Sequence, residues 1–282
     1  MRLGSWQLDT VSGGKMLLDG GTIFGIIPKA MWQKVQPADE NNRIQIATNC
    51  VLARDGRHTV LVDTGYGGKF SDKERGRAGL EPGEPLLASL AALGVSPEEI
   101  DTVALSHLHF DHAGGGTRKD ATGKIVTTFP NARYFAQRGE WQTALSGVPE
   151  LRGAYPLEHL LPVEESGRLI LLEGDGEIVP GLSGQVTGGH TEWHQALVFS
   201  SEGETAVYLG DLCPTAASVR TFWGMSYDTD PLETRRRKPL LLGQAADEGW
   251  LLMWDHDPKI AAGRIARDPD REFVVTDPMP AL

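Results

Sequence analysis

The chain has 282 residues, enough to bury one large core, and its 40% hydrophobic and 23% charged residues are ordinary for a globular protein. Its formal net charge of −11 argues against a nucleic-acid-binding protein, which needs a basic surface to neutralise phosphates. Two cysteines are too few for a disulfide framework, no apolar run can span a bilayer, and residues 1–9 do not resemble a signal peptide, so we expect no membrane partner and a cytoplasmic location.

The first half of the chain is predicted to contain strands followed by short helices. In chain order the predicted elements are strands at 44–54 and 59–63, a helix at 85–93, a short helix capped by Ser96 and a buried strand at 100–105. The turn between the first two strands falls at Asp55 and Gly56, and Gly94 ends the longer helix. Pro97 favours the first position of the short helix.

The second half continues with short apolar runs rich in β-prone residues. The predicted strands are 184–187, 195–200, 205–209 and 251–254. Residues 234–250 are predicted to form a helix, although Pro239 and Gly243 interrupt its pattern. No linker rich in Pro, Gly or Ser divides the chain, so we expect one domain over residues 1–282.

Side chains of metal-ligand types follow several predicted strands, at the point where each strand ends. These residues are His107, His190, Asp211 and the pair Asp255 and His256. Neighbouring strands of one sheet would bring their ends to one edge, which is where ligand sites are favoured. The pattern therefore predicts a metal site assembled from distant parts of the sequence.

The densest part of this pattern is residues 107–112, His-Leu-His-Phe-Asp-His. In an extended segment His107 and His109 point the same way and can hold one metal ion. Asp111 and His112 follow at the turn and can face a second ion. Imidazole and carboxylate suit Zn²⁺, and also Fe, Mn or Co. The alternative, polar residues that merely cap a strand, fits poorly because three of the eight histidines fall within six positions.

The motif, with a strand before it and Gly114, Gly115 and Gly116 after it, resembles the signature of the metallo-β-lactamase superfamily. Other segments resemble further superfamily motifs: residues 62–65 (Val-Asp-Thr-Gly), 188–191 (Gly-Gly-His-Thr), 210–211 (Gly-Asp) and 255–256 (Asp-His). The resemblance implies an α/β fold, the four-layer αββα sandwich. The glycines allow close backbone packing behind the site.

The resemblance also implies a complete ligand set for two divalent metal ions. The implied ligands are His107, His109 and His190 for the first ion, Asp111, His112 and His256 for the second, and Asp211 for both. Asp63 and His194 are expected to orient ligands without binding metal. Taken alone, Asp211 has a simpler interpretation as a helix N-cap and His256 as an exposed histidine.

Two such ions lie about 3.5–4 Å apart and lower the pKa of a shared water towards neutrality. We expect the bridging hydroxide to attack an ester or lactone carbonyl, with Asp111 passing a proton to the leaving oxygen. Asp111 and Asp211 are thus the predicted catalytic residues. The bridging Asp211 argues against a true β-lactamase, and we find no glutathione-binding extension or nuclease domain.

The N-terminal half also resembles one branch of the superfamily, the quorum-quenching N-acyl homoserine lactonases and especially their YtnP-like members. The similar segments are residues 19–25 (Asp-Gly-Gly-Thr-Ile-Phe-Gly), 28–32 (Pro-Lys-Ala-Met-Trp) and 129–132 (Phe-Pro-Asn-Ala). The resemblance implies an acyl-chain pocket formed by Phe110, Phe24, Ile23 and Tyr66, for which ordinary core packing is the alternative. It leaves a homodimer open.

Pro214 departs from the lactonase pattern, which places a Tyr three residues after the bridging Asp. Proline has no hydroxyl, so either another group supplies this hydrogen bond or the preferred substrate differs. The first hypothesis is a two-metal lactonase that opens the ring of N-acyl homoserine lactones, and the second is a phosphotriesterase or arylesterase of the same fold. A metal-binding scaffold without catalysis is the third, and the complete ligand set weighs against it.

Overall fold

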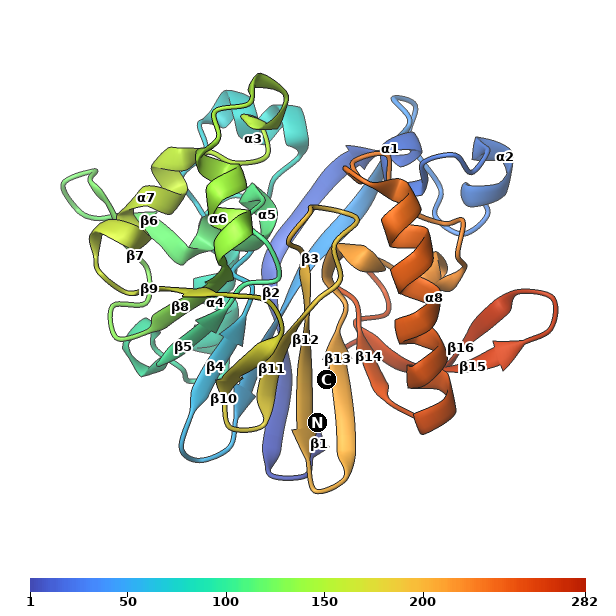
Figure 1. Ribbon diagram of the computed structural model, residues 1–282. Coiled ribbons are helices and arrows are strands. Elements are labelled where there is room, and N and C mark those ends of the chain that lie inside the picture. Colours follow the sequence, from blue (N-terminus) through green and yellow to red (C-terminus); the bar gives the residue numbers. More distant parts are fainter.

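The computed structural model describes residues 1–282, and two facing β-sheets with helices on their outer sides form its frame (Figure 1). The first sheet contains, in spatial order, β1 (Arg2–Leu3), β2 (Trp6–Asp19), β3 (Arg43–Arg54), β4 (Thr59–Val62), β5 (Thr102–Ala104), β8 (Arg133–Gln137) and β9 (Leu169–Leu172). The second contains β10 (Gly176–Val179), β11 (Leu182–Val186), β12 (Gln195–Ser201), β13 (Glu204–Tyr208), β14 (Leu251–Met253), β15 (Ala262–Asp268) and β16 (Glu272–Met279).

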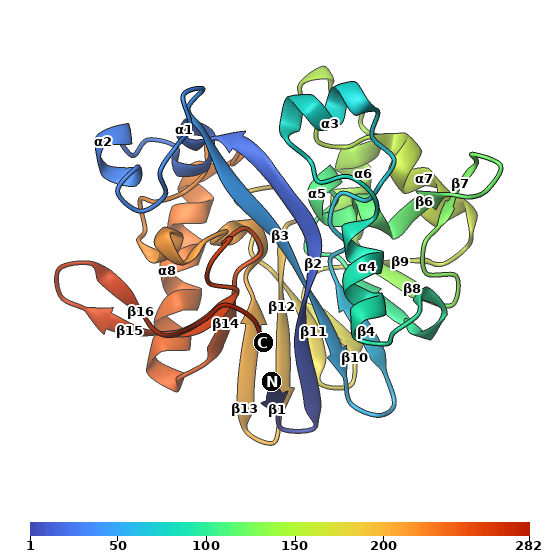
Figure 2. The ribbon, with the colours of Figure 1, turned by 180° about the vertical axis from the view of Figure 1, so that it is seen from behind.

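Helices cover the outer face of each sheet, as the two opposite views show (Figures 1 and 2). On the first sheet they include α4 (Pro85–Ala92), α5 (Phe110–Ala113), α6 (Arg138–Leu145) and α7 (Leu157–Glu165). The second sheet carries the long α8 (Pro231–Glu248), which packs on β15. The predicted four-layer αββα sandwich is therefore confirmed.

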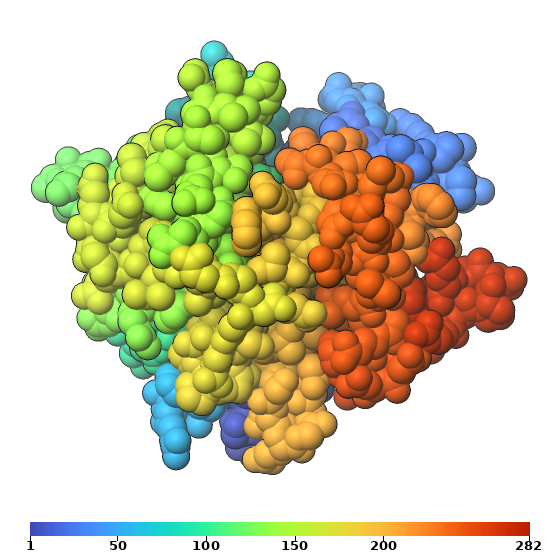
Figure 3. Space-filling view, viewed as in Figure 1, coloured from blue at the N-terminus to red at the C-terminus, as the bar shows by residue number.

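The remaining elements lie near the edges of these layers. They are α1 (Gly20–Phe24), α2 (Lys29–Trp32), α3 (Asp72–Ala78) and the small hairpin of β6 (Thr117–Lys119) and β7 (Ile125–Thr127). In the space-filling view α8, in orange, flanks the golden strands of the second sheet, and the green segments that carry α6 lie on their other side (Figure 3). No helix is both long enough and apolar enough to cross a membrane.

Strand β3 shows why the sheets stack. Val51 and Ala53 face the second sheet, whereas Cys50 and Leu52 face the helices on the outer side. All four side chains are buried, so this strand is apolar on both faces, as expected for a central layer. Burying each larger aliphatic side chain contributes about 1.5–3 kcal/mol.

Parallel strand pairs determine where the site forms. Strands β4, β5 and β8 run parallel in the first sheet, and β13 and β14 run parallel in the second, with α8 as the connection between the latter two. Parallel neighbours end at the same edge of their sheet, so the loops that follow β5, β13 and β14 emerge close together. The helix α8 begins at Pro231, with the Asp230 carboxylate accepting the N–H groups of Leu232 and Glu233.

Candidate metal centre

Four loops meet at one end of the sandwich and bring the predicted metal ligands together. His107 and His109 lie between β5 and α5, and His190 follows β11. Asp211 lies in the short 3₁₀ helix η4 (Gly210–Leu212) after β13, and His256 follows β14. Strand β5 ends at Ala104, so His107 and His109 lie in the loop after it; the backbone of His109 is still extended, and the two side chains converge.

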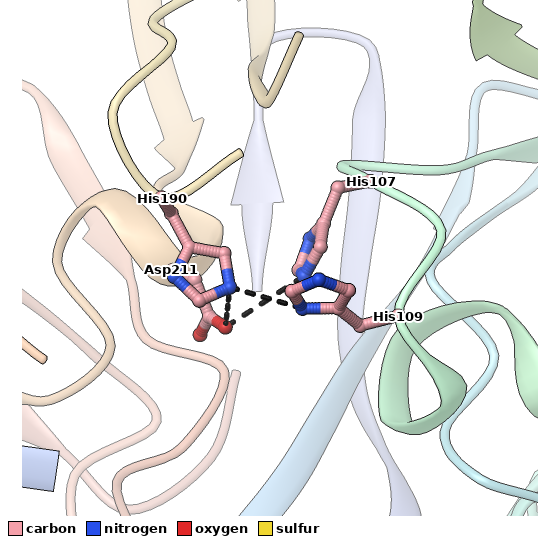
Figure 4. Close-up of side chains that lie close together, drawn as sticks. All are labelled: His107, His109, His190 and Asp211. Atoms are coloured by element: carbon pink, nitrogen blue, oxygen red, sulfur yellow. Dashed lines mark hydrogen bonds and ion pairs between the residues drawn. The ribbon is translucent and has the colours of Figure 1, made fainter. Parts of the chain in front are cut away.

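The first group consists of His107, His109, His190 and Asp211 (Figure 4). The Nε2 atom of His190 is 2.9 Å from Oδ2 of Asp211 and 3.1 Å from Nδ1 of His109. Nε2 of His107 is 3.7 Å from the same carboxylate oxygen. Ligand atoms of a tetrahedral zinc ion, at about 2.1 Å from the metal, are about 3.4 Å from one another. The spacing of the group therefore suits one cation at its centre.

The second group consists of His112, Asp211, Asp255 and His256, with Asp111 beside it. Nε2 of His256 is 3.1 Å from Oδ1 of Asp211 and 3.6 Å from Oδ2 of Asp111. Nε2 of His112 is 3.6 Å from Oδ2 of Asp211 and 3.9 Å from Oδ1 of Asp111. Asp211 thus belongs to both groups, which is the arrangement expected of a bridging carboxylate.

Several buried atoms of the two groups lack any hydrogen-bond partner within the protein. They are Nε2 of His107, Nε2 of His112, Oδ1 of Asp211 and Oδ2 of Asp255. Leaving a buried polar atom unpaired costs about 1–3 kcal/mol, and bound cations would satisfy these lone pairs. The donor set, imidazole nitrogens with carboxylate oxygens, suits Zn²⁺ and related divalent ions. The residues present therefore fit a two-metal centre.

The opposite ring nitrogen of four of these histidines is held by a protein oxygen. In each case Nδ1 donates a hydrogen bond, which leaves Nε2 free to face the centre. The acceptors are Ser106 Oγ for His107 (3.1 Å), Asp63 Oδ2 for His112 (2.8 Å), Asp228 Oδ1 for His190 (3.1 Å) and the Ala47 carbonyl oxygen for His256 (2.7 Å).

Asp63 accepts more hydrogen bonds than the other acceptors behind these histidines. Besides the His112 ring it accepts the Ser106 N–H and hydroxyl, each at 2.7 Å, and the Tyr208 hydroxyl at 3.0 Å. Its backbone has a φ of 54°, in the left-handed region that few residues other than Gly, Asn and Asp adopt. Asp63 thus lies directly behind His112, and its expected role in orienting a metal ligand remains a prediction.

His194 lies beside the first group without entering it. Its ring centroid is 5.2 Å from that of His107, and its Nδ1 is 2.6 Å from the Thr187 hydroxyl oxygen. Burial lowers the pKa of His194 to about 3, because there is little room to solvate a charged imidazolium. Its position agrees with the expected supporting role, which remains a prediction.

Glu140, on α6, is a buried carboxylate that the sequence did not single out. It accepts hydrogen bonds from the Leu108 N–H at 3.2 Å, the Tyr155 hydroxyl at 2.8 Å and the Thr191 hydroxyl at 2.6 Å. These contacts tie the loop of His109 to the loop that follows β11. Burial raises the pKa of Glu140 in spite of these donors. The side chain thus fixes the backbone around the first group.

The protonation of the groups reflects a balance between burial and charge. Burial disfavours imidazolium, yet Asp211 and Asp228 raise the pKa of His190 to about 10. Against the same burial, Asp255 and Asp211 raise the pKa of His256 to about 9. The pKa of Asp211 lies well below its usual value, since three imidazoles outweigh its burial. Without cations, His190 and His256 are therefore protonated, and metal binding must displace these protons.

A cavity of about 390 Å³ opens onto both groups. Its walls include Leu18, Ile23, His109, Phe110, Asp111, Leu151, Ala154, His190, Asp211, Met225, Tyr227, Thr229 and His256. Ile23 and Phe110 therefore lie on the cavity, as expected for substrate-contacting residues. Met225 and Tyr227 come from the irregular segment between Val219 and α8, where no motif drew attention to them.

Phe24 and Tyr66 do not line this cavity, contrary to expectation. Phe24 is fully buried, where its ring stacks on Trp32 and meets Trp223 edge-on. The Tyr66 hydroxyl donates to the Lys15 carbonyl, and the ring is buried in the same cluster. The alternative of ordinary core packing therefore describes both residues.

Residues 44–256 match the Metallo-beta-lactamase superfamily, and the chain belongs to this superfamily. It is 29% identical over 179 residues to an N-acyl homoserine lactonase of Bacillus cereus, which is 60% of this chain and 64% of that protein. It is 30% identical over 171 residues to N-acyl homoserine lactonase AiiA of Bacillus thuringiensis subsp. kurstaki, which is 57% and 61% of the two chains. The match thus spans less than two thirds of these relatives.

Solved structures resemble the whole chain. A probable metal-dependent hydrolase from Staphylococcus aureus is 30% identical, with a TM-score of 0.89 and coverage of 99% of this chain and 100% of that chain. AidC, described as a dizinc quorum-quenching lactonase in complex with a product, is 24% identical, with a TM-score of 0.79 and coverage of 98% and 95%. The likeness to AidC shows the fold alone.

Proposed function

We propose that this protein is a two-metal hydrolase that opens the lactone ring of N-acyl homoserine lactones. The observation that carries the proposal is Asp211, which joins two groups of metal-ligand side chains beneath a partly apolar cavity. The lactonase names of the Bacillus relatives support this choice of substrate class.

The proposed ligands are His107, His109 and His190 for one ion, Asp111, His112 and His256 for the other, and Asp211 for both. Bound there, two divalent cations, expected to be zinc with Fe, Mn or Co as alternatives, would lower the pKa of a shared water and polarise the substrate carbonyl. Asp111 lines the cavity as well as the second group, so its carboxylate is placed to hold a proton for the leaving oxygen.

The apolar part of the cavity suits an acyl chain. Leu18, Ile23, Phe110 and Met225 supply aliphatic and aromatic surface next to the metal groups. A volume of about 390 Å³ lies within the usual range of small-molecule sites. The substrate would place its ring over the metals and its chain along these side chains.

Tyr227 is our candidate for the hydroxyl that Pro214 lacks. Pro214 is buried, and its carbonyl oxygen accepts the His256 N–H at 2.9 Å. Pro214 therefore positions the backbone of the proposed metal ligand His256 and does not contact the substrate. Tyr227 is the tyrosine on the cavity wall, and its side chain is half-exposed. We propose that its hydroxyl donates to the substrate carbonyl as negative charge develops there.

The proposal is tested by incubating metal-loaded protein with hexanoyl and decanoyl homoserine lactones, with and without a chelator, and measuring the ring-opened acid. We expect hydrolysis that the chelator abolishes; its absence would overturn the lactonase proposal. Because Pro214 departs from the lactonase pattern, paraoxon and phenyl acetate belong in the same panel. A much higher kcat/KM on either one would favour the phosphotriesterase or arylesterase alternative instead, and inactivity on every substrate would favour the scaffold.

A further inference from the structure

Asp255 is a third carboxylate in the second group, and no step of the proposed reaction uses it. It follows β14 immediately before His256, and its side chain is 1% exposed. Oδ2 is 3.8 Å from Nε2 of His256 and 4.0 Å from Nε2 of His112. In a five-coordinate site, ligands about 2.1 Å from the metal and 120° apart are about 3.6 Å from each other. The carboxylate is therefore within coordinating distance of the same centre.

The two oxygens of Asp255 differ in what they contact. Oδ1 accepts the N–H of His256 at 3.0 Å, whereas Oδ2 is buried without any hydrogen-bond partner. A carboxylate whose purpose was to hold the loop would use both oxygens, because an unpaired buried oxygen is costly. The unpaired oxygen is the one that faces the two histidines, which points to a cation as its partner.

Asp255 also lies on the side of the second group away from the substrate. Asp111, Asp211 and His256 line the cavity, whereas Asp255 does not. A substrate in the cavity would therefore meet the cation before it met this carboxylate. Contact with the metal, rather than with the substrate, is the role that this position allows.

With Asp255 included, the two metal positions differ in chemistry. The first has three imidazoles and the shared Asp211. The second has two imidazoles and up to three carboxylates, Asp111, Asp211 and Asp255. Oxygen-rich sites with higher coordination numbers suit harder cations such as Mn²⁺, whereas sites rich in imidazole and low in coordination number suit Zn²⁺.

We infer that Asp255 is a further metal ligand at the second position and that it reduces the preference of this position for Zn²⁺ over Mn²⁺ relative to the first. The inference rests on the proposed two-metal centre. Zn²⁺ is still expected to bind more tightly than Mn²⁺ at both positions, following the general affinity order of divalent ions. The quantity that Asp255 sets is therefore the Zn²⁺-to-Mn²⁺ affinity ratio at the second position.

The test measures Zn²⁺ and Mn²⁺ affinities by titration of metal-free protein, with the Mn²⁺ electron paramagnetic resonance signal as the readout of bound manganese. His109→Ala isolates the second position, and His256→Ala isolates the first. In the His109→Ala background, Asp255→Asn should weaken Mn²⁺ binding by about tenfold or more and Zn²⁺ binding by clearly less. Asn keeps the acceptor for the His256 N–H, so the loop retains that contact.

Asp257→Asn is the matched control. Asp257 lies two residues further along, where its carboxylate accepts the N–H groups of Ala216, Lys259 and Ile260. We expect the Zn²⁺-to-Mn²⁺ ratio to be unchanged in this variant. An unchanged ratio in Asp255→Asn, or equal losses for both ions, would overturn the inference.

A comparison of the two isolated positions keeps the inference testable if Asp255→Asn does not fold. The Zn²⁺-to-Mn²⁺ ratio must be smaller in His109→Ala than in His256→Ala, and an equal or larger ratio refutes the inference. Wild-type protein that binds fewer than two cations would instead contradict the two-metal centre itself. The two failures are therefore distinguishable.

Discussion

Replacing Asp63 with Asn removes one charge and one acceptor oxygen behind the centre and leaves the size of the side chain almost unchanged. The carboxylate accepts four hydrogen bonds, three of them at Oδ2, from Ser106, His112 and Tyr208. An amide accepts through one oxygen only, so at least one buried donor faces an N–H, which costs about 1–3 kcal/mol. The remaining bonds lose a charged acceptor, which brings the expected loss of unfolding free energy to roughly 3–5 kcal/mol. Asn tolerates the left-handed backbone, so no strain is added.

The assay is denaturant unfolding of metal-free protein, followed by metal titration of the folded variant. We expect Asp63→Asn to weaken the second metal position by about 10–100-fold, since His112 loses the acceptor that orients it, and to affect the first position less. Asp9→Asn is the control, because Asp9 lies in a partly exposed ion pair with Arg54 that is worth about 0–1 kcal/mol. A loss below 1 kcal/mol in Asp63→Asn with unaltered metal affinity would refute the reasoning.

Three further outcomes follow from the cavity and the protonation of the centre. Tyr227→Phe should lower kcat on homoserine lactones by about 10–100-fold with a smaller change in KM, and an unchanged kcat would exclude its hydroxyl as the carbonyl donor. Phe110→Ala should raise KM for the decanoyl substrate more than for the hexanoyl substrate, because Phe110 lines the cavity. Phe24→Ala should instead lower the free energy of unfolding by about 3–5 kcal/mol, because the Phe24 ring packs in the core. The pKa of His190 is about 10 and that of His256 about 9, so both are protonated at neutral pH without metal. Metal binding should therefore release protons and weaken as pH falls. Calorimetry in buffers of different ionisation enthalpy measures this release, and its absence would contradict the assignment of these histidines as metal ligands.

Much of the central framework could be predicted because its signals are local. The strands at 44–54 and 59–63 were found as β3 and β4, and the turn between them forms with Asp55 accepting the N–H groups of the next residues. The short helix after Ser96 forms as a 3₁₀ turn with the capping contacts of Ser96 and Glu99. The glycine run also packs as expected, since a Cβ on Gly115 would collide with the carbonyl oxygen of Thr64.

Strand β2 was missed for a physical reason. Gly13 and Gly14 interrupt it and suggest a loop, yet the strand continues past an irregular register between Ser12 and Lys15. Gly13 is needed because a Cβ there would lie 2.7 Å from the Cα of Gly65, in the turn after Asp63. The glycine thus serves a close approach between distant segments, which the sequence does not display.

The candidate site also has a part that the sequence predicted and a part that it did not. The predicted ligand residues belong to short motifs, so their pattern along the chain is enough to group them. Asp228 and Glu140 carry no such signal, because an acidic residue is usually exposed and only tertiary packing buries these two side chains. Asp255 stands in the Asp-His motif, but its place beside the second group was not expected. The contact of Asp228 with His190 joins two loops that are 38 residues apart. Only the structure could identify the side chains that contact the predicted ligands from outside the two groups.

The most direct test of the two-metal centre is the number of cations bound per chain, measured by elemental analysis of reconstituted protein after removal of free metal. We expect two cations in the wild-type protein and fewer than two in Asp211→Ala, because Asp211 belongs to both ligand groups. One cation or none in the wild-type protein, or two tightly held cations in Asp211→Ala, would contradict the proposed centre.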